Sequence, residues 1–167
     1  MSASPPPNRA TPPAGLPEHV KQAAILRNRA VAALKDGRAP AAEALLRDAL
    51  RIFPSFAEAE IRIGNIRRAS HDLDGAAAAY RRALRIKPDY PWAHLELAIC
   101  LQRAGEAEAA MTHYREAVRF NPKLYKTVLF AMVDQPQGCF WLDTRALKRE
   151  LLGEAALRVQ QPEKDSA

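Results

Sequence analysis

The strongest constraint on the fold is an internal repeat with a step of 34 residues. Pro54, Pro88 and Pro122 are separated by this step, and five further columns of residues keep the same register. These columns hold Ala42, Ala76 and Ala110; Leu46, Tyr80 and Tyr114; Ala49, Ala83 and Ala117; Leu50, Leu84 and Val118; and Ile52, Ile86 and Phe120. Self-similarity at a fixed period indicates a stack of equivalent units, each of which buries its apolar face against the next.

Each copy of the repeat is predicted to contain two helices. In the middle copy, Ala76, Tyr80, Ala83 and Leu84 are spaced so that they share one face of an α-helix. The proline that closes each copy stops this helix, because the residue before a proline is pushed out of the α region. At the break between the two helices, where a left-handed cap suits glycine, the copies hold Gly37, His71 and Gly105. The pattern therefore predicts an all-α protein.

One signature within the repeat is specific. An alanine, an aromatic residue four positions later and a closing proline occur as Ala110, Tyr114 and Pro122, and the middle copy has the same three residue types. Leu46 replaces the aromatic residue in the first copy. In these positions the chain resembles the tetratricopeptide repeat (TPR) family. The resemblance implies a helix-turn-helix solenoid of about three TPR repeats, at residues 23–56, 57–90 and 91–124.

The sequence also departs from the family pattern. The column in which the family usually has tryptophan holds Leu26, Glu60 and His94, and Arg29 replaces a leucine in the first copy. A polar residue is expected in the outermost repeat, because one side of its first helix has no neighbouring repeat.

The segments outside the repeats are predicted to differ in role. Residues 1–17 contain six prolines and few apolar side chains, which favours a disordered Pro-rich tail over a docking motif. Residues 125–160 are expected to form capping helices that seal the end of the solenoid. The apolar run at 139–142 either packs on that end or is a separate interaction site. Residues 161–167 are expected to be a second disordered tail.

Composition narrows the classes of function. An apolar share of 48% supports a buried core, and Cys100 and Cys139 are too few for a disulfide framework or a cysteine-based zinc site. No apolar run reaches the roughly 18 residues of a membrane-spanning helix. The N-terminus lacks the pattern of a secretory signal, so a cytoplasmic location is expected. The net charge of +6 favours acidic partners only weakly.

Catalytic chemistry has little support in the sequence. There is no glycine-rich phosphate loop, nucleophile elbow or zinc-protease motif, so we expect a protein with no enzymatic activity and no cofactor. His94 and His113 lie on the two helices of the third repeat and are placed to approach one another. A metal site would need a third ligand, such as Cys100 or Glu116, so packing is the favoured interpretation. Cys100 is interpreted as a small buried apolar residue.

The resemblance implies a binding surface on the concave side, lined by the first helix of each repeat. The corresponding positions here are Arg27, Asn28, Val31, Ile61, Arg62, Asn65, Arg68, Trp92, Leu95, Ile99 and Arg103. Family members that bind the C-terminal carboxylate of chaperones use a fixed set of lysine, asparagine and arginine side chains. Arg27 and Arg62 match that set loosely, but Val31, Trp92 and Glu96 break it, which disfavours a chaperone-tail adaptor.

The leading hypothesis is a non-enzymatic scaffold or adaptor that binds a protein segment in this groove and assembles a complex. Trp92, Leu95 and Ile99 form a second apolar stripe on their helix, and a helix needs only one stripe to pack on its neighbours. Either the following helix, at 124–133, covers the second stripe, or a partner does. Since basic residues outnumber acidic ones in the groove, the expected partner segment has apolar anchors and acidic flanks.

Two alternatives remain. One is a subunit that associates with itself through an end of the solenoid. The other is binding to nucleic acid or anionic membrane through a stripe of arginines on the second helices. The stripe comprises Arg47, Arg51, Arg81, Arg85, Arg115 and Arg119. No aromatic residues interleave it to stack on bases, so a solvated outer face is the favoured interpretation.

Overall fold

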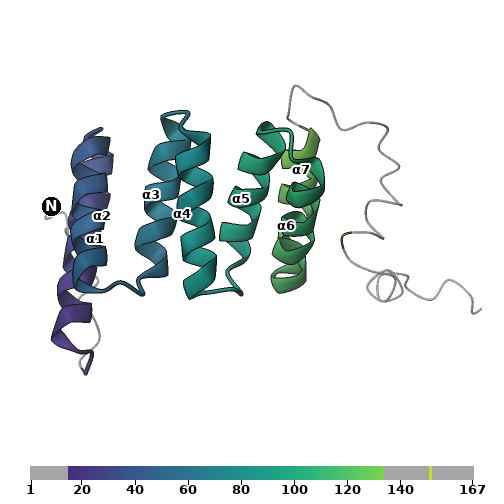
Figure 1. Cartoon of the computed structure of the whole chain (residues 1–167). Coiled ribbons are helices and arrows are strands. Elements are labelled where there is room, and N and C mark those ends of the chain that lie inside the picture. The colour runs from purple at the N-terminus through teal and green to yellow at the C-terminus, as the bar shows by residue number, and fades with distance from the viewer. Residues whose placement is uncertain (1–14, 134–150, 152–167) are drawn as a thin grey trace, which may run out of the picture. The chain divides into compact units, whose positions relative to one another are not determined.

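The computed structural model describes residues 15–133 and Leu151 (Figure 1). The chain divides between Ser55 and Phe56 into two compact units. Unit 1 is described here over residues 15–55, and unit 2 over residues 56–133 and Leu151. Within the described residues all regular structure is helical. None of these helices combines the length and hydropathy that a membrane crossing requires.

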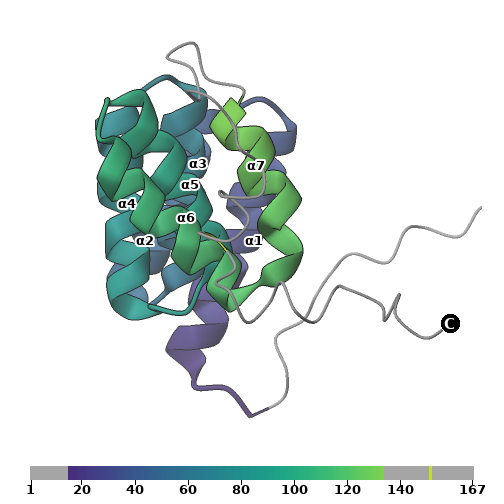
Figure 2. The same ribbon diagram turned by 90° about the vertical axis from the view of Figure 1, so that its right-hand side faces the viewer.

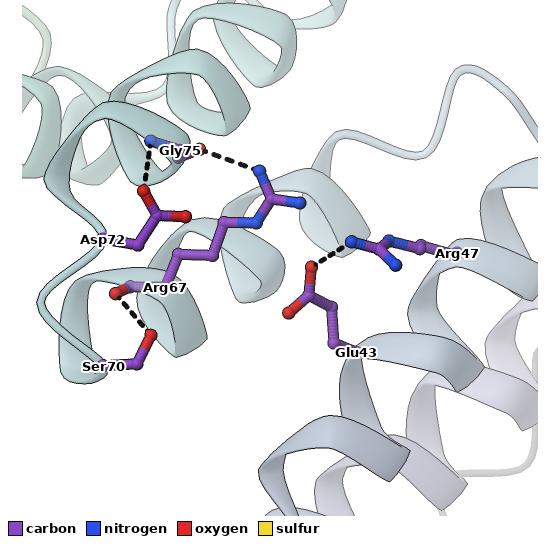
Figure 3. A network of polar contacts seen from close by, with 6 residues as sticks. All are labelled: Glu43, Arg47, Arg67, Ser70, Asp72 and Gly75. Carbon is purple, nitrogen blue, oxygen red and sulfur yellow. Dashed lines mark hydrogen bonds and ion pairs between the residues drawn. The ribbon is translucent and has the colours of Figure 1, made fainter.

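Unit 1 is a helical hairpin built on small side chains. Helix α1 (Glu18–Lys35) packs along helix α2 (Ala39–Ile52). The buried side chains of the two helices are alanines and Leu46, which is fully buried. At the turn, Gly37 has a φ of +72°, and the amide of Arg38 donates to the carbonyl of Ala33 at 2.8 Å. The predicted left-handed cap is therefore present. On the surface of α2, Arg47 donates to Glu43 at 2.7 Å (Figure 3).

Unit 2 continues the hairpin pattern. Its elements are α3 (Ala57–Ala69), α4 (Leu73–Ile86), α5 (Pro91–Arg103), α6 (Ala107–Phe120), a short 3-10 helix η1 (Pro122–Leu124) and α7 (Tyr125–Val133). Helices α3 and α4 form one hairpin and α5 and α6 the next, and α4 packs on α5 (Figures 1 and 2). Helix α7 then contacts both α5 and α6. This succession is a helical solenoid, and it confirms the predicted fold class.

The repeat columns form the core of unit 2. Ala76, Ala83, Ala110 and Ala117 are all buried, as the predicted helix faces require. Tyr80 and Tyr114 are the largest fully buried side chains in the described part of the chain. The core extends to α7 and includes Leu151, which lies within the predicted capping segment. The apolar run at 139–142, residues 1–14 of the N-terminal tail predicted at 1–17, and the C-terminal tail predicted at 161–167 lie outside the described residues.

Both buried tyrosines have partners for their hydroxyl groups on the preceding helix. Tyr80 on α4 donates to Oδ1 of Asn65 on α3 at 2.7 Å. Tyr114 on α6 donates to Oε1 of Gln102 on α5 at 2.6 Å. The amide nitrogen of Gln102 donates in turn to the carbonyl of Met132 on α7 at 3.2 Å. These bonds compensate for burying polar groups and tie consecutive helices together.

The turn between α3 and α4 is the one described turn in which a side chain occupies the left-handed position. His71 has a φ of +63°, whereas Gly105 at the equivalent place in the next hairpin has a φ of +85°. Asp72 then caps α4, because its carboxylate accepts from the amide of Gly75 at 2.9 Å (Figure 3). Arg67 donates to the carbonyl of Gly75 at 3.4 Å, which braces the same turn.

Replacing His71 with glycine is expected to stabilise unit 2 by about 0.5–1 kcal/mol. Left-handed backbone is strained for a residue with a Cβ, and relief of this strain outweighs the added freedom of the unfolded chain. The exposed histidine ring contributes little packing that would be lost. Urea denaturation followed by circular dichroism measures the change. The companion variant Gly105→Ala should shift the midpoint in the opposite direction, and a lower midpoint for His71→Gly would contradict the strain argument.

Candidate functional site

The predicted groove residues fall on three first helices, in two units. Arg27, Asn28 and Val31 lie on α1 in unit 1, where Asn28 is exposed and the other two are half-buried. The remaining residues lie in unit 2. On α3 they are Ile61, Arg62, Asn65 and Arg68, and on α5 they are Trp92, Leu95, Ile99 and Arg103. Eight of the eleven candidate residues thus belong to unit 2.

On α3, the basic side chains are engaged with acidic neighbours. Arg62 donates to Oε1 of Glu58 on the same helix at 2.8 Å. Nε of Arg68 lies 2.9 Å from Oε2 of Glu96 on α5, forming an ion pair between the helices. Burial raises the pKa of the Glu96 carboxyl, and the charge of Arg68 offsets part of this effect. Much of the positive charge expected along this helix is thus neutralised within the protein.

Two apolar residues assigned to the groove belong to the core instead. Leu95 is 2% exposed and Ile61 is 7% exposed, and both are members of the core cluster of unit 2. That cluster also contains Val128 and Met132 of α7, so the helix that follows the third repeat shares the core with Leu95. Neither side chain is available on the surface to contact a ligand.

Other residues on α5 are accessible. Trp92 in its first turn is 47% exposed, and Ile99 is half-buried against the core. Arg103, in the last turn, is exposed. Packing therefore divides the predicted second apolar stripe of this helix: Leu95 is buried, Ile99 is half-buried and Trp92 is accessible.

Helix α7 contributes a residue that the sequence analysis did not assign. Phe130 is 69% exposed, more than any other large apolar side chain in the described part of the chain. Leu129 beside it is half-buried, and Lys126 one turn earlier is exposed. The signal was available, since Phe130 follows Glu96 by one repeat step and Arg62 by two. The groove positions were taken only from residues 23–124, whereas 125–160 was expected mainly to cap the solenoid.

The arginines of the second helices are exposed but partly paired. Arg47 bonds to Glu43 and Arg51 to Asp48, both at 2.7 Å, within unit 1. In unit 2, Arg119 lies 2.7 Å from Glu116. Neighbouring carboxylates thus neutralise at least three of the six arginines in the predicted stripe, which weakens the case for a phosphate-binding surface.

Groups capable of chemistry do not assemble a reactive centre in the described residues. Nδ1 of His94 lies 3.0 Å from Nδ1 of His113, so the two rings do meet. No cluster of three or more metal-ligating side chains accompanies them within residues 15–133 and Leu151. Burial, aided by the charge of Glu96, raises the pKa of the Cys100 thiol to about 11. A thiol with so high a pKa is a poor nucleophile at neutral pH.

Comparisons with known proteins agree with this architecture. Two family models described as tetratricopeptide repeat match the chain, one over residues 18–57 and the other over residues 67–129. No curated protein sequence matches it significantly.

Solved structures share the fold at low sequence identity. The first TPR of Spaghetti (RPAP3), bound to the HSP90 peptide SRMEEVD, is 12% identical, with a TM-score of 0.63 over 67% of this chain and 89% of that one. The N-terminal domain of stress-induced protein-1 from C. elegans is 13% identical, with a TM-score of 0.62 over 70% of this chain and 98% of that one. An O-GlcNAc transferase of Thermobaculum terrenum is 23% identical, with a TM-score of 0.65 over 86% of this chain and 27% of that one.

Proposed function

Since the chain belongs to the tetratricopeptide repeat family, we propose that it is a non-enzymatic scaffold that binds a segment of another protein on the first helices of its repeats. The observation that carries the proposal is the exposure of two aromatic side chains, Trp92 and Phe130, on α5 and α7. Both helices are already packed through other faces into the core of unit 2. Exposed apolar side chains mark an interaction site where they form a contiguous patch, and we propose that Trp92 and Phe130 belong to one such patch.

Aromatic residues are well suited to anchor a partner. They offer a large rigid area at a small cost in side-chain entropy, and they dominate the energetics of many interfaces. We therefore assign Trp92, Phe130 and the half-buried Ile99 as the apolar contacts of the ligand. Leu95 and Ile61 act behind this surface, as part of the core that holds α5 and α3 in place.

The charge around these anchors favours an acidic partner segment. Arg62 and Arg68 are engaged with Glu58 and Glu96. Two further basic side chains, Arg103 on α5 and Lys126 on α7, are solvent-exposed. Exposed charges of one sign at an interface speed association with an oppositely charged partner, and salt screens this attraction. The peptide SRMEEVD of the Spaghetti complex likewise combines apolar with acidic residues, which supports the same partner chemistry here.

A peptide selection tests the proposal. A display library of random short peptides is panned on the full chain, and a selected peptide is synthesised for titration calorimetry. We expect apolar residues flanked by Asp or Glu. Trp92→Ala and Phe130→Ala should each weaken binding by about tenfold or more, which corresponds to about 1.4 kcal/mol. Ile86→Ala, which removes a 36% exposed side chain from α4, is the matched control and should bind normally.

Two results would contradict the proposal. One is equal weakening by Ile86→Ala, because the effect would then not belong to the first helices. The other is an oligomer of the wild-type chain that Phe130→Ala converts to a monomer, because Phe130 would then serve self-association. Circular dichroism on each variant shows that the helical fold is retained.

A further inference from the structure

A buried pair of histidines joins α5 to α6 in unit 2. His94 is 8% exposed, and its Nδ1 lies 3.0 Å from Nδ1 of His113. The His94 ring also stacks on Phe120, with centroids 5.7 Å apart and planes inclined by 22°. The pair therefore lies where the first turn of α5 meets the last two turns of α6.

The hydrogen bonds define where the protons are in the neutral pair. Nε2 of His94 lies 2.8 Å from the carbonyl oxygen of Pro88, and a carbonyl only accepts, so Nε2 carries the hydrogen. A neutral imidazole has one N–H, which leaves Nδ1 of His94 as an acceptor. Nδ1 of His113 must then be the donor between the rings. One arrangement of hydrogens thus satisfies every contact of the pair.

Added protons disturb this arrangement in two steps. The first proton can be accommodated without losing the bond between the rings, but it places a positive charge in a buried site. The second proton leaves two N–H groups facing each other across 3.0 Å. Each step is more unfavourable in the folded state than in the unfolded chain, where both rings are solvated.

The surrounding charges add to this effect. Burial lowers the pKa of His113, and the proximity of His94 and of Arg81 on α4 lowers it further, while Glu116 on α6 opposes the shift. Arg119 lies over the ring of Phe120, which stacks on His94; its guanidinium carbon is 4.5 Å from the Phe120 ring centroid. Arg81 therefore opposes protonation of His113, while the carboxylate of Glu116, which favours it, is itself paired with Arg119 at 2.7 Å.

We propose that the His94–His113 pair is an acid-sensitive latch that holds the first turn of α5 against α6 and releases it when the pair takes up protons. A group whose folded pKa is below its unfolded value contributes its full stability above the unfolded pKa, about 6.5 for histidine, and this contribution is lost as the pH falls below that value. The released turn carries Trp92. The evidence for the latch is the set of contacts made by His94 and His113 and does not depend on the proposed function. Only the effect of the latch on ligand binding rests on the proposed function.

Amide hydrogen exchange on the full chain, without ligand, tests the latch. In the first turn of α5, the amides of Ala93 and His94 donate to the carbonyl of Tyr90 at 3.1 and 3.2 Å. The equivalent amide of Ala59, which donates to Phe56 at 3.0 Å in α3, is an internal reference. After correction for intrinsic rates, protection of Ala93 relative to Ala59 should fall between about pH 7.5 and about pH 5.5. If opening of the turn takes up one proton, the relative protection of Ala93 can fall by at most about tenfold per pH unit. If opening takes up two protons, the limit is about a hundredfold per pH unit.

Variants separate this pair from other titrating groups. His94→Gln and His113→Gln should flatten the pH dependence, since glutamine does not titrate in this range. His71→Asn is the matched control, because His71 is exposed and asparagine tolerates its left-handed backbone, and it should behave as the wild type. A wild-type slope in folded His113→Gln would overturn the proposal.

A measurement on the wild type decides the question if the glutamine variants do not fold. Nitrogen-15 NMR of the imidazole rings should show His94 with its hydrogen on Nε2, and His113 with a pKa below the usual value for histidine. A His113 ring that titrates at or above the ordinary value of about 6.5 would overturn the latch. None of these measurements involves a ligand, so failure of the proposed function would leave their interpretation unchanged.

Discussion

Replacing Tyr114 with alanine is expected to destabilise unit 2 by about 3–5 kcal/mol, the range typical of removing a buried aromatic ring. The ring is 1% exposed and lies in the core cluster together with residues of α5 and α7. Its hydroxyl is bonded to Gln102, whose amide also holds the end of α7. The substitution therefore leaves both a cavity and an amide acceptor without its partner. Urea denaturation of the full chain, followed by circular dichroism, measures the loss.

The conservative variant Tyr114→Phe separates the two contributions. It keeps the ring and removes only the hydroxyl, so the expected loss is about 0.5–1.5 kcal/mol. A Tyr114→Ala protein as stable as the wild type would show that this helix face is not buried. A Tyr114→Phe protein as unstable as Tyr114→Ala would show instead that the bond to Gln102, rather than the packing of the ring, is the main contribution.

Replacing Gly64 with valine is expected to cost about 3 kcal/mol, at the upper end of the usual range for overpacking a core. A Cβ on Gly64 would lie 2.5 Å from Cε1 of Tyr80, far inside van der Waals contact. The Tyr80 ring is fully buried and its hydroxyl is tethered to Asn65, so it cannot move aside without breaking other contacts. Thermal and urea denaturation should both show the loss.

The matched control for Gly64→Val is Ala69→Val on the same helix, because Ala69 is exposed and reports only the lower helix propensity of valine. Ala69→Val should change stability by well under about 1 kcal/mol. If Gly64→Val were equally mild, α3 and α4 would not approach each other as closely as described. Truncating the ring in Gly64→Val/Tyr80→Leu should recover part of the loss, since the clash is with that ring.

Much of the fold could be predicted because repetition reveals which positions are equivalent. The column that holds Ala76 and Ala110 was expected to face the core, and both residues are buried. The left-handed turns at Gly37, His71 and Gly105 were also expected from their register, and all three have positive φ. These features depend on local rules, namely helical periodicity and the conformational freedom of single residues, which a sequence displays directly.

The candidate site could be predicted only in outline. Register alone assigned both Trp92 and Leu95 to the ligand-facing side of their helix. It could not show that Leu95 would be buried with Val128 and Met132 while Trp92 would remain 47% exposed. Nor could it show that Arg68 would pair with Glu96, 28 positions away, and so lose much of its availability to a partner. Exposure and pairing depend on distances between helices.

The sequence by itself determined the family, the all-α solenoid and the helix on which each candidate residue lies. Each of these follows from the 34-residue period, because the same pattern occurs in every repeat. Only the tertiary structure decided which of those residues reach the surface, and it added Phe130, which no register argument had selected. It also decided that a side chain at Gly64 would collide with the Tyr80 ring, although Ala98 occupies the equivalent place one repeat later. The physical reason is that packing is a property of pairs of helices: the same column meets different neighbours in each repeat, and those neighbours determine burial, charge pairing and access.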